Sequence, residues 1–258
     1  MSRLYFQCAA RSAVGLVRNG NEDSALVGSQ LIAIADGMGG HAGGEFASSV
    51  AINTLSEIAP TFVNADVDSG SASDLFLNSL HTIDLQIRAV TQDEPQLAGM
   101  GTTLTALFLN DTEISLLHVG DSRAYRLRGN ELIQLSADHT VLQDLLNKGI
   151  ISESDAQIHP QRSMLTQALM GEGNLEPSLH VFEGKIKDRY LLCSDGLTGV
   201  LSDKEIKSLI KGKDAVAAVD ALIDATYING APDNVTVILA DLVESSNTDV
   251  GKLGAAKA

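Results

Sequence analysis

The fold is decided by the stretch Leu31-Ile-Ala-Ile-Ala-Asp36-Gly37-Met-Gly39-Gly40-His41-Ala-Gly43-Gly44, in which an apolar run is followed by a carboxylate and a glycine-rich turn. The run is short, contains branched residues and is bounded by turn residues, which is typical of a buried strand. Asp36 therefore stands where a strand reaches the surface, and the glycines after it allow a sharp turn or a close approach to a ligand. Taken alone, this carboxylate fits two roles: a ligand to a bound group, or the cap of a strand-to-helix turn.

The composition is that of a globular, acidic protein. Of the 258 residues, 44% are hydrophobic and 20% are charged, which excludes a disordered chain. The formal net charge of −15 argues against nucleic acid as a partner, because phosphate backbones attract basic surfaces. It also means that an anionic substrate needs local cations, either metal ions or arginines. We find no apolar segment of membrane-spanning length and no signal-peptide pattern, so we expect a cytoplasmic protein without membrane contact, with Cys8 and Cys193 reduced.

Apolar runs separated by short turns predict antiparallel hairpins, because a short turn cannot join parallel strands. We expect strands at residues 3–10, 25–27, 31–36, 100–109, 113–119, 124–127, 131–135, 189–193 and 235–243. Apolar residues at helical spacing predict helices at residues 44–58, 73–90, 140–148, 152–157, 202–211 and 214–228. Residues 138–175 are expected to form a segment outside the sheet rather than a new domain. The small, polar residues 244–258 are expected to be frayed.

Acidic residues recur at the ends of the predicted strands. Asp36, Asp121 and Asp195 each end an apolar strand, and Asp233 precedes one. Glu22 and Asp23 lie in a loop next to the strand that pairs with Leu31–Asp36. Each one alone fits a turn cap, but carboxylates gathered at one end of a sheet repel each other unless a cation lies among them. Oxygen ligands without histidine or cysteine nearby suit Mg²⁺ or Mn²⁺ rather than zinc.

A pair of such ions supports hydrolysis of phosphate monoesters, since two metals supply a bridging hydroxide and hold the oxygens of an in-line displacement. The uncatalysed reaction is among the slowest known. Arg18 lies four residues before Glu22 and can offer a planar fork to the phosphoryl oxygens.

Six short motifs, in this order, resemble the PPM-type (type 2C) metal-dependent serine/threonine protein phosphatases in their bacterial form. The motifs are Arg18-x-x-Asn21-Glu22-Asp23, Asp36-Gly37-Met38-Gly39-Gly40-His41, Gly101-Thr102-Thr103, Gly120-Asp121-Ser122-Arg123, Ser194-Asp195-Gly196-Leu197 and Asp233-Asn234-Val235-Thr236. Any one motif is weak, but six in order are specific, and they extend over most of the chain. The resemblance implies an α+β fold: a four-layer α-β-β-α sandwich, with a central antiparallel β-sandwich flanked by helix pairs. It further implies a catalytic domain over residues 1–243, with a flap subdomain at about 139–175 that shapes substrate access and a flexible tail at 244–258.

The resemblance also implies a site with two core ions, Mn²⁺ or Mg²⁺, and a third, weaker one. Its metal residues would be Glu22, Asp23, Asp36, Gly37, Asp121, Asp195 and Asp233. In this scheme Asp36 bridges the two core ions and Gly37 contributes its backbone carbonyl. Glu22 and Asp23 reach the metals mainly through waters, and Asp121 helps to hold the third ion.

The implied catalytic residues are Arg18, Asp36 and His41, with Arg18 binding phosphate. His41 has two open roles: a general acid toward the leaving alkoxide, or a residue that packs the glycine-rich loop. The implied partners are phosphoserine and phosphothreonine proteins together with serine/threonine kinases and their substrates, in signalling, and we expect a monomer. Two departures concern substrate preference: Ala13 stands where relatives carry aspartate, and Gln167-Ala-Leu-Met170 replaces Arg-Ala-Leu-Gly.

Two other classes of function remain as alternatives. The spacing Gly37-x-Gly39-x-x-Ala42, with Glu57 about 20 residues on, fits a dinucleotide-binding oxidoreductase. Against it, residues 61–73 are too polar for the required second strand, and Asp36 would oppose the pyrophosphate. The second alternative is a non-catalytic binding module of the same fold, which loss of the strand-end aspartates or Arg18 would favour; none is missing.

Overall fold

Strand β3 (Leu31–Met38) lies at the centre of the fold because both of its faces are covered. The computed structural model describes residues 3–39, 43–63, 68–152, 164–175 and 178–257. Ile32 and Ile34 belong to the core between two sheets, whereas Ala33 and Ala35 belong to the core beneath the helices. Successive side chains of a strand point to opposite faces, so a strand covered on both faces needs apolar residues throughout. This requirement explains the uninterrupted apolar run before Asp36.

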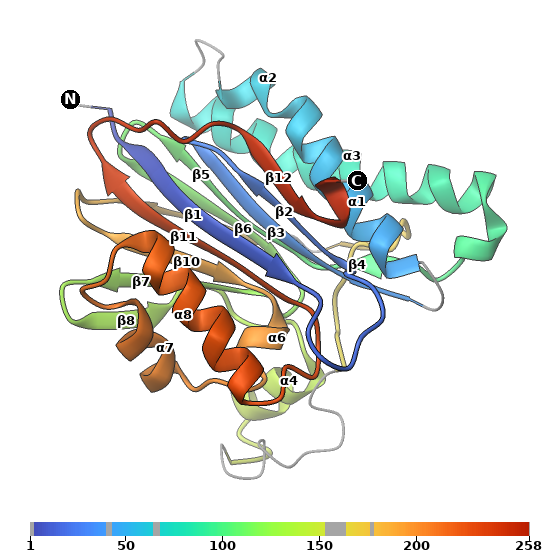
Figure 1. Cartoon of the computed structure of the whole chain (residues 1–258). Helices are drawn as coiled ribbons and strands as arrows, with labels where there is room; N and C mark the ends of the chain where they lie inside the picture. Colours follow the sequence, from blue (N-terminus) through green and yellow to red (C-terminus); the bar gives the residue numbers. More distant parts are fainter. Residues whose placement is uncertain (1–2, 40–42, 64–67, 153–163, 176–177, 258) are drawn as a thin grey trace.

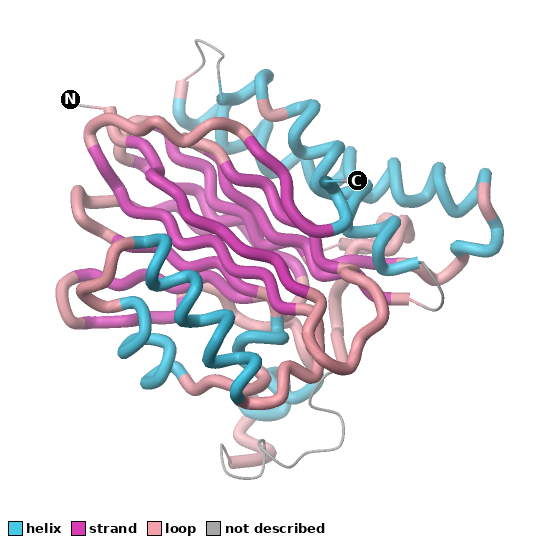
Figure 2. Tube along the Cα trace, viewed as in Figure 1, coloured by secondary structure: helices cyan, strands magenta, loops and turns pink. Residues whose placement is uncertain are grey.

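Two antiparallel sheets stack face to face (Figures 1 and 2). One sheet has the strand order β1-β11-β10-β7-β8, with β1 (Tyr5–Ala13), β7 (Arg123–Arg128), β8 (Glu131–Gln134), β10 (Arg189–Cys193) and β11 (Val235–Val243). The other has the order β12-β2-β3-β5-β6-β9, and β4 pairs with β3 beside this path. Its remaining strands are β2 (Asp23–Val27), β4 (Gly101–Thr102), β5 (Leu104–Asn110), β6 (Glu113–Val119), β9 (Ser178–Glu183) and β12 (Gly251–Gly254). The predicted hairpins are confirmed as β2–β3, β5–β6 and β7–β8.

Helix pairs cover the two outer faces of the sandwich (Figure 1). Helices α1 (Gly43–Ile58) and α3 (Ser69–Asp93) lie on the sheet that contains β3, and α7 (Asp203–Ile210) and α8 (Ala215–Ile228) lie on the other. The short helices are α2 (Pro60–Val63), η1 (Pro95–Leu97), α4 (Val141–Asn147), α6 (Asp195–Thr198) and η2 (Ala255–Lys257). Local caps fix where α7 and α8 begin: Ser202 and Glu205 form a capping box, and Asp214 accepts a hydrogen bond from the backbone N–H of Ala217.

Three apolar cores separate the four layers. Phe76 and Leu55 lie in the core between α1, α3 and the β3 sheet. Phe6 lies in the core between the two sheets, and Leu191 and Leu222 lie in the core beneath α7 and α8. The four-layer α-β-β-α sandwich is therefore confirmed.

The C-terminal residues pack on the sheet, which corrects the expectation of a flexible tail at 244–258. Strand β12 pairs with β2, and the Lys252 ammonium donates a 2.6 Å hydrogen bond to Asn53 Oδ1. Ala255 and Ala256 are buried. The small residues that suggested a frayed end permit this close packing: Gly254 has φ +66, and a Cβ there would lie 2.0 Å from the Asp23 carbonyl oxygen. This segment covers the edge of β2, which would otherwise expose unpaired backbone groups.

Two further parts of the chain differ from expectation. Strand β9, which pairs with β6 at the other edge of the same sheet, was not predicted because half-buried and exposed side chains mix along it. Within residues 138–175, α4 confirms the first predicted helix, whereas most of the helix predicted at 152–157 falls outside the described residues. Over the described ranges, no helix is both long enough and apolar enough to cross a bilayer.

Candidate active site

The strand-end carboxylates come together because β2 and β3 are paired in register. Asp23 lies directly opposite Asp36 in this pair. Asp36 is also fixed from its other side: its backbone N–H donates to Thr103 Oγ1 at 3.0 Å, and its carbonyl accepts from the Thr103 N–H at 2.9 Å and from Thr102 Oγ1 at 2.9 Å. The Gly101-Thr102-Thr103 motif thus holds the end of β3 in place.

Asp23 is only 1% exposed, and its Oδ2 accepts a hydrogen bond from the Ser194 hydroxyl at 2.8 Å. Its other carboxylate oxygen, Oδ1, is buried without a hydrogen-bond partner in the structure. A buried, unpartnered carboxylate oxygen is costly unless a positive group satisfies it. This oxygen therefore fits a cation or a cation-bound water.

Asn234 ties three segments of the site together. Its amide donates to the carbonyl oxygens of Val14 at 2.7 Å and Gly20 at 2.8 Å, and its Oδ1 accepts from the Glu22 N–H at 2.8 Å. A Cβ on Gly196 would lie 1.9 Å from the Asn234 carbonyl oxygen, so only glycine fits there. These contacts place the loop that carries Arg18 and Glu22 beside the start of α6.

Gly37 is held where no side chain fits. A Cβ there would lie 2.0 Å from the Gly44 carbonyl oxygen and 2.6 Å from the Glu22 carbonyl oxygen. The Gly37 N–H donates to that Glu22 carbonyl at 3.1 Å. The glycine-rich turn therefore allows α1 to begin directly against the acidic end of β3.

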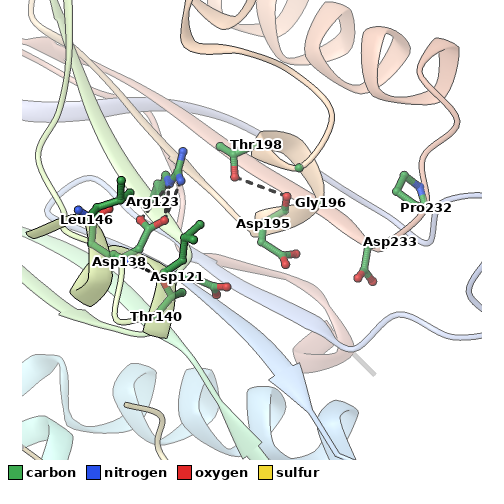
Figure 3. A pocket seen from close by; sticks show the side chains of 13 residues that line it. Asp121, Arg123, Asp138, Thr140, Leu146, Asp195, Gly196, Thr198, Pro232 and Asp233 are labelled. Carbon is green, nitrogen blue, oxygen red and sulfur yellow. Dashed lines mark hydrogen bonds and ion pairs between the residues drawn. The ribbon is translucent and has the colours of Figure 1, made fainter. Parts of the chain in front are cut away.

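Two neighbouring cavities meet at the carboxylates, and Asp121, Asp195 and Asp233 line both of them. One cavity, of about 540 Å³, is also lined by Arg18, Glu22, Asp36, Gly37, Thr103, Gln167 and Met170. The other, of about 640 Å³, extends beneath α4 and is also lined by Arg123, Asp138, Thr140, Leu142, Leu146 and Thr198. Figure 3 shows Asp121, Asp195 and Asp233 directing their carboxylates toward a shared space. The predicted residues Arg18, Glu22, Asp36, Gly37, Asp121, Asp195 and Asp233 thus share one region, with Asp23 buried behind it.

The carboxylates disfavour one another's charge. Burial, and then repulsion from Asp23 and Asp195, raises the pKa of Asp36 well above its usual range. Burial and the neighbouring Asp195 raise the pKa of Asp121 to about 7, and burial followed by Asp233 raises that of Asp195. Such a group of acids needs a positive charge to ionise together.

Arg18 supplies one positive charge at the rim. Its Nη2 lies 2.6 Å from Asp233 Oδ2, and its side chain is 48% exposed. The hydrogen bond to Asp233 is the main reason that the pKa of Arg18 is raised. Among the described residues this is the one hydrogen bond of the Arg18 side chain, which also lines the cavity.

The donor set matches the hard cations expected from the sequence. In the described part of the chain, no three acidic, histidine or cysteine side chains are already arranged so that they could hold one metal ion. The carboxylates instead surround the cavity, and together with the Gly37 carbonyl they offer only oxygen, the preference of Mg²⁺ and Mn²⁺. His118 lies apart in the core, where its ring nitrogens face Thr105 Oγ1 at 2.9 Å and the Ala137 carbonyl at 3.0 Å, and burial lowers its pKa to about 3. His41 lies outside the described residues.

Residues 171–173, near the end of the predicted flap, are anchored to α3, a connection that the sequence did not indicate. The buried Asp84 carboxylate accepts hydrogen bonds from the backbone N–H of Gly171 at 2.7 Å and of Gly173 at 2.9 Å. Arg88 Nε donates to the Gly171 carbonyl. Leu169 and Thr102 exchange two backbone hydrogen bonds, which sets Gln167 and Met170 against the cavity.

Several positioning residues were missed from the sequence, although most lie inside the motifs. Thr103, Ser194 and Asn234 were quoted as parts of motifs but given no role, and Asp84 was not singled out. Polar residues next to strand-end aspartates were the available signal for the first three. For Asp84 the only signal was a carboxylate on the apolar stripe of a predicted helix.

Comparison with known proteins agrees with this site. Residues 20–226 match the family model described as Protein phosphatase 2C. The serine/threonine protein phosphatase PstP of Mycobacterium tuberculosis is 42% identical over 241 residues, which cover 93% of this chain and 46% of that protein. The serine/threonine phosphatase stp of Listeria welshimeri is 35% identical over 237 residues, which cover 90% of this chain and 94% of that protein. A crystal structure of the PstP catalytic domain with two manganese ions superposes with a TM-score of 0.84 at 40% identity, covering 93% of this chain and 99% of that one.

The chain belongs to the protein phosphatase 2C family. It spans about half the length of the mycobacterial relative. The dinucleotide-binding alternative is wrong, because that fold requires a parallel sheet and both sheets here are antiparallel.

Proposed function

We propose that this chain is a metal-dependent phosphatase that removes phosphate from phosphoserine and phosphothreonine residues of proteins. The observation that carries the proposal is one cavity lined by carboxylates from distant parts of the chain, with Arg18 at its rim. The manganese ions in the similar PstP structure support it. A non-catalytic module of the same fold would be expected to lack some of the strand-end aspartates or Arg18, and this chain keeps all of them.

The residues that would hold the ions are those predicted from the sequence. Asp36 would bridge two ions, helped by the Gly37 carbonyl, with Asp195 and Asp233 completing the set. Glu22 and Asp23 would act through waters, and Asp121 would help to hold a third ion. When bound, the Mn²⁺ or Mg²⁺ ions supply the Lewis acidity that activates water and offset the charge of the phosphoryl group.

The chain's own residues bind and orient the substrate. Arg18 would exchange its contact with Asp233 for a two-pronged hydrogen bond to the phosphoryl oxygens, once cations occupy the carboxylates. Thr103 and Asn234 keep Asp36 and the arginine loop in place. His41 would donate a proton to the departing side-chain oxygen, or else pack the loop; a pH profile of the His41→Gln variant would separate these roles.

The open cavity suits a phosphorylated side chain presented by a polypeptide, and kinase-modified proteins are the partners we propose. A signalling role, a cytoplasmic location and a monomeric state belong to the same proposal. Its catalytic domain would extend over residues 1–243 with a flap at about 139–175, and the packed residues 251–257 would complete the β3 sheet.

Turnover of a small aryl phosphate tests the activity directly. The purified chain is expected to hydrolyse it with Mn²⁺ and to lose all turnover after chelation, because the carboxylates need cations to act together. Phosphate release is the readout, and the absorbance of NADH added to the same sample is expected to stay unchanged. Release that persists at full rate in excess chelator would contradict the proposal.

The Arg18→Ala variant tests phosphate binding. Its KM for a phosphopeptide is expected to rise about tenfold, because a charged hydrogen-bond donor to the phosphate is lost, with a smaller change in kcat. Arg11→Ala is the matched control, since Arg11 is an exposed arginine paired with Asp220 on α8. Equal KM values for the Arg18 and Arg11 variants would show that Arg18 does not bind phosphate.

A further inference from the structure

Positive charge is concentrated in one part of this acidic chain. Six of its nine lysines lie between residues 185 and 213, whereas the chain as a whole carries a net charge of −15. Three of these lysines, Lys187, Lys211 and Lys213, line a groove of about 640 Å³. The groove lies between the β7–β8 turn, the connection before β10 and the connection between α7 and α8. In Figure 1 these connections are at the left, away from α4 and α6.

The floor of the groove is neutral because its two charges are paired. Arg189 and Asp241, opposite each other on β10 and β11, form a two-pronged ion pair with distances of 2.6 and 2.7 Å. Arg189 Nη1 also donates to the carbonyl oxygens of Ile210 at 2.6 Å and Lys213 at 2.8 Å. This arginine therefore makes four hydrogen bonds, and it fixes the α7–α8 connection against the sheet.

The rim of the groove keeps its positive charge. Lys211 Nζ donates to the neutral Asn130 Oδ1 at 2.7 Å, so its charge is held in place but not cancelled. Lys187 and Lys213 are exposed, and within the described ranges neither forms an ion pair. The one carboxylate on the rim, Asp214, accepts from the N–H of Ala217 at the start of α8.

The connection that presents Lys187 is rigidly built. The buried Asp188 carboxylate accepts from Arg128 Nη2 at 2.6 Å, from the Tyr190 hydroxyl at 3.1 Å and from the Lys185 N–H at 2.8 Å. These bonds hold Lys187 at φ 72, a left-handed conformation that glycine or asparagine adopts more easily than lysine.

From these contacts we propose that the groove binds an acidic polypeptide segment of the phosphoprotein substrate. Three ammonium groups around a neutral floor, one of them held by Asn130, complement a run of aspartate and glutamate side chains. The floor of the groove lies about 20 Å from Asp195, because Arg189 stands six positions before it along β10 and the extended Ser194, at ~3.3 Å per step. An acidic segment bound there would raise the local concentration of a phosphorylated residue near the carboxylates.

Direct binding tests the groove without any catalysis. A fluorescent, unphosphorylated oligo-glutamate peptide is expected to bind the chain at low salt and to weaken as salt rises. The Lys187→Glu/Lys213→Glu variant is expected to bind it at least about fivefold more weakly. The control Lys204→Glu/Lys257→Glu changes the net charge equally at exposed lysines away from the groove. Equal loss in both variants, or binding of a labelled oligonucleotide in place of the peptide, would overturn the proposal.

A tethered substrate tests the use of the groove and rests on the proposed function. Two phosphopeptides are compared, with and without an acidic segment joined by a Gly/Ser linker of about 13 residues, whose mean reach is ~20 Å. With the wild type, the KM of the acidic peptide is expected to be about fivefold lower than that of the peptide without the acidic segment. This difference should disappear in the groove variant and remain in the control variant. Aryl phosphate turnover should be the same in all three proteins. If none of the three proteins hydrolysed either substrate, the phosphatase activity alone would be contradicted. If the acidic peptide kept its lower KM in the groove variant, the docking role alone would be contradicted.

Discussion

The Asp36→Asn variant is expected to lose about 1,000-fold in kcat while its metal-free form becomes more stable than the wild type. Asp36 lies opposite Asp23 and is repelled by Asp23, Asp121, Asp195 and Asp233, and it is the residue that we propose as the ligand shared by two ions. Asparagine keeps the shape but removes the charge, which weakens metal binding and also relieves that repulsion. Aryl phosphate turnover with Mn²⁺ and thermal unfolding in chelator measure the two effects separately.

The stability of the metal-free protein should also depend on pH with a definite sign. Because burial and neighbouring acids raise the pKa of Asp36 in the folded chain, the folded state holds its proton at a pH where the unfolded state has lost it. The resulting stability is full below the ordinary carboxyl pKa and is lost as the pH rises through the raised value. The neighbouring Asp121, whose pKa is raised to about 7, acts in the same direction. The Tm in chelator should therefore fall as the pH rises from the ordinary carboxyl range to about 7 and beyond, and fall less in Asp36→Asn.

The control for this experiment is Asp93→Asn, which removes an exposed carboxylate from α3. It should leave turnover and the pH dependence of Tm unchanged, and added Mn²⁺ should stabilise it as it stabilises the wild type. If Asp36→Asn lowered the Tm in chelator, the carboxylate would be stabilising the fold, and the interpretation as a cation ligand would be wrong.

The sequence predicted those features that depend on neighbours along the chain. The hairpins could be predicted from the short turns at Asn110–Asp111 and Gly129–Asn130, because strands joined by a two-residue turn can pair only in antiparallel orientation. The strand-end aspartates could also be predicted from local sequence, since each follows or precedes an apolar run. The layer order and the individual metal roles came from the family resemblance, and the roles stay predictions.

Features that depend on contacts between distant segments were not predicted. The end of the chain looked frayed because glycine and alanine are common in tails, yet Gly254 is needed where the backbone meets Asp23. Asn234 holds residues more than 200 positions earlier in the chain, and no local pattern reports such a bond. Strand β9 was missed because an edge strand with mixed exposure lacks a clear alternation.

The Asp84→Ala variant shows how such a distant contact affects catalysis. Its kcat/KM for a phosphopeptide is expected to fall by about 10–100-fold, because small displacements of groups that position a substrate are costly. Without the carboxylate, the N–H groups of Gly171 and Gly173 lose their acceptor, and the segment with Gln167 and Met170 loses one of its two anchors, the other being the Leu169–Thr102 pair. The free energy of unfolding should fall by about 1–3 kcal/mol, the cost of leaving buried donors unpaired.

The matched control is Asp74→Ala, which removes an exposed carboxylate from the same helix. The comparison of two substrates separates positioning from general damage to the fold. The Asp84 variant should turn over the small aryl phosphate nearly as well as wild type at saturating Mn²⁺, because Asp84 touches none of the cavity carboxylates, and lose mainly the phosphopeptide reaction. A fall in Tm with kcat/KM unchanged for both substrates would show that Asp84 only stabilises the fold, since the flap would then keep its place without this anchor.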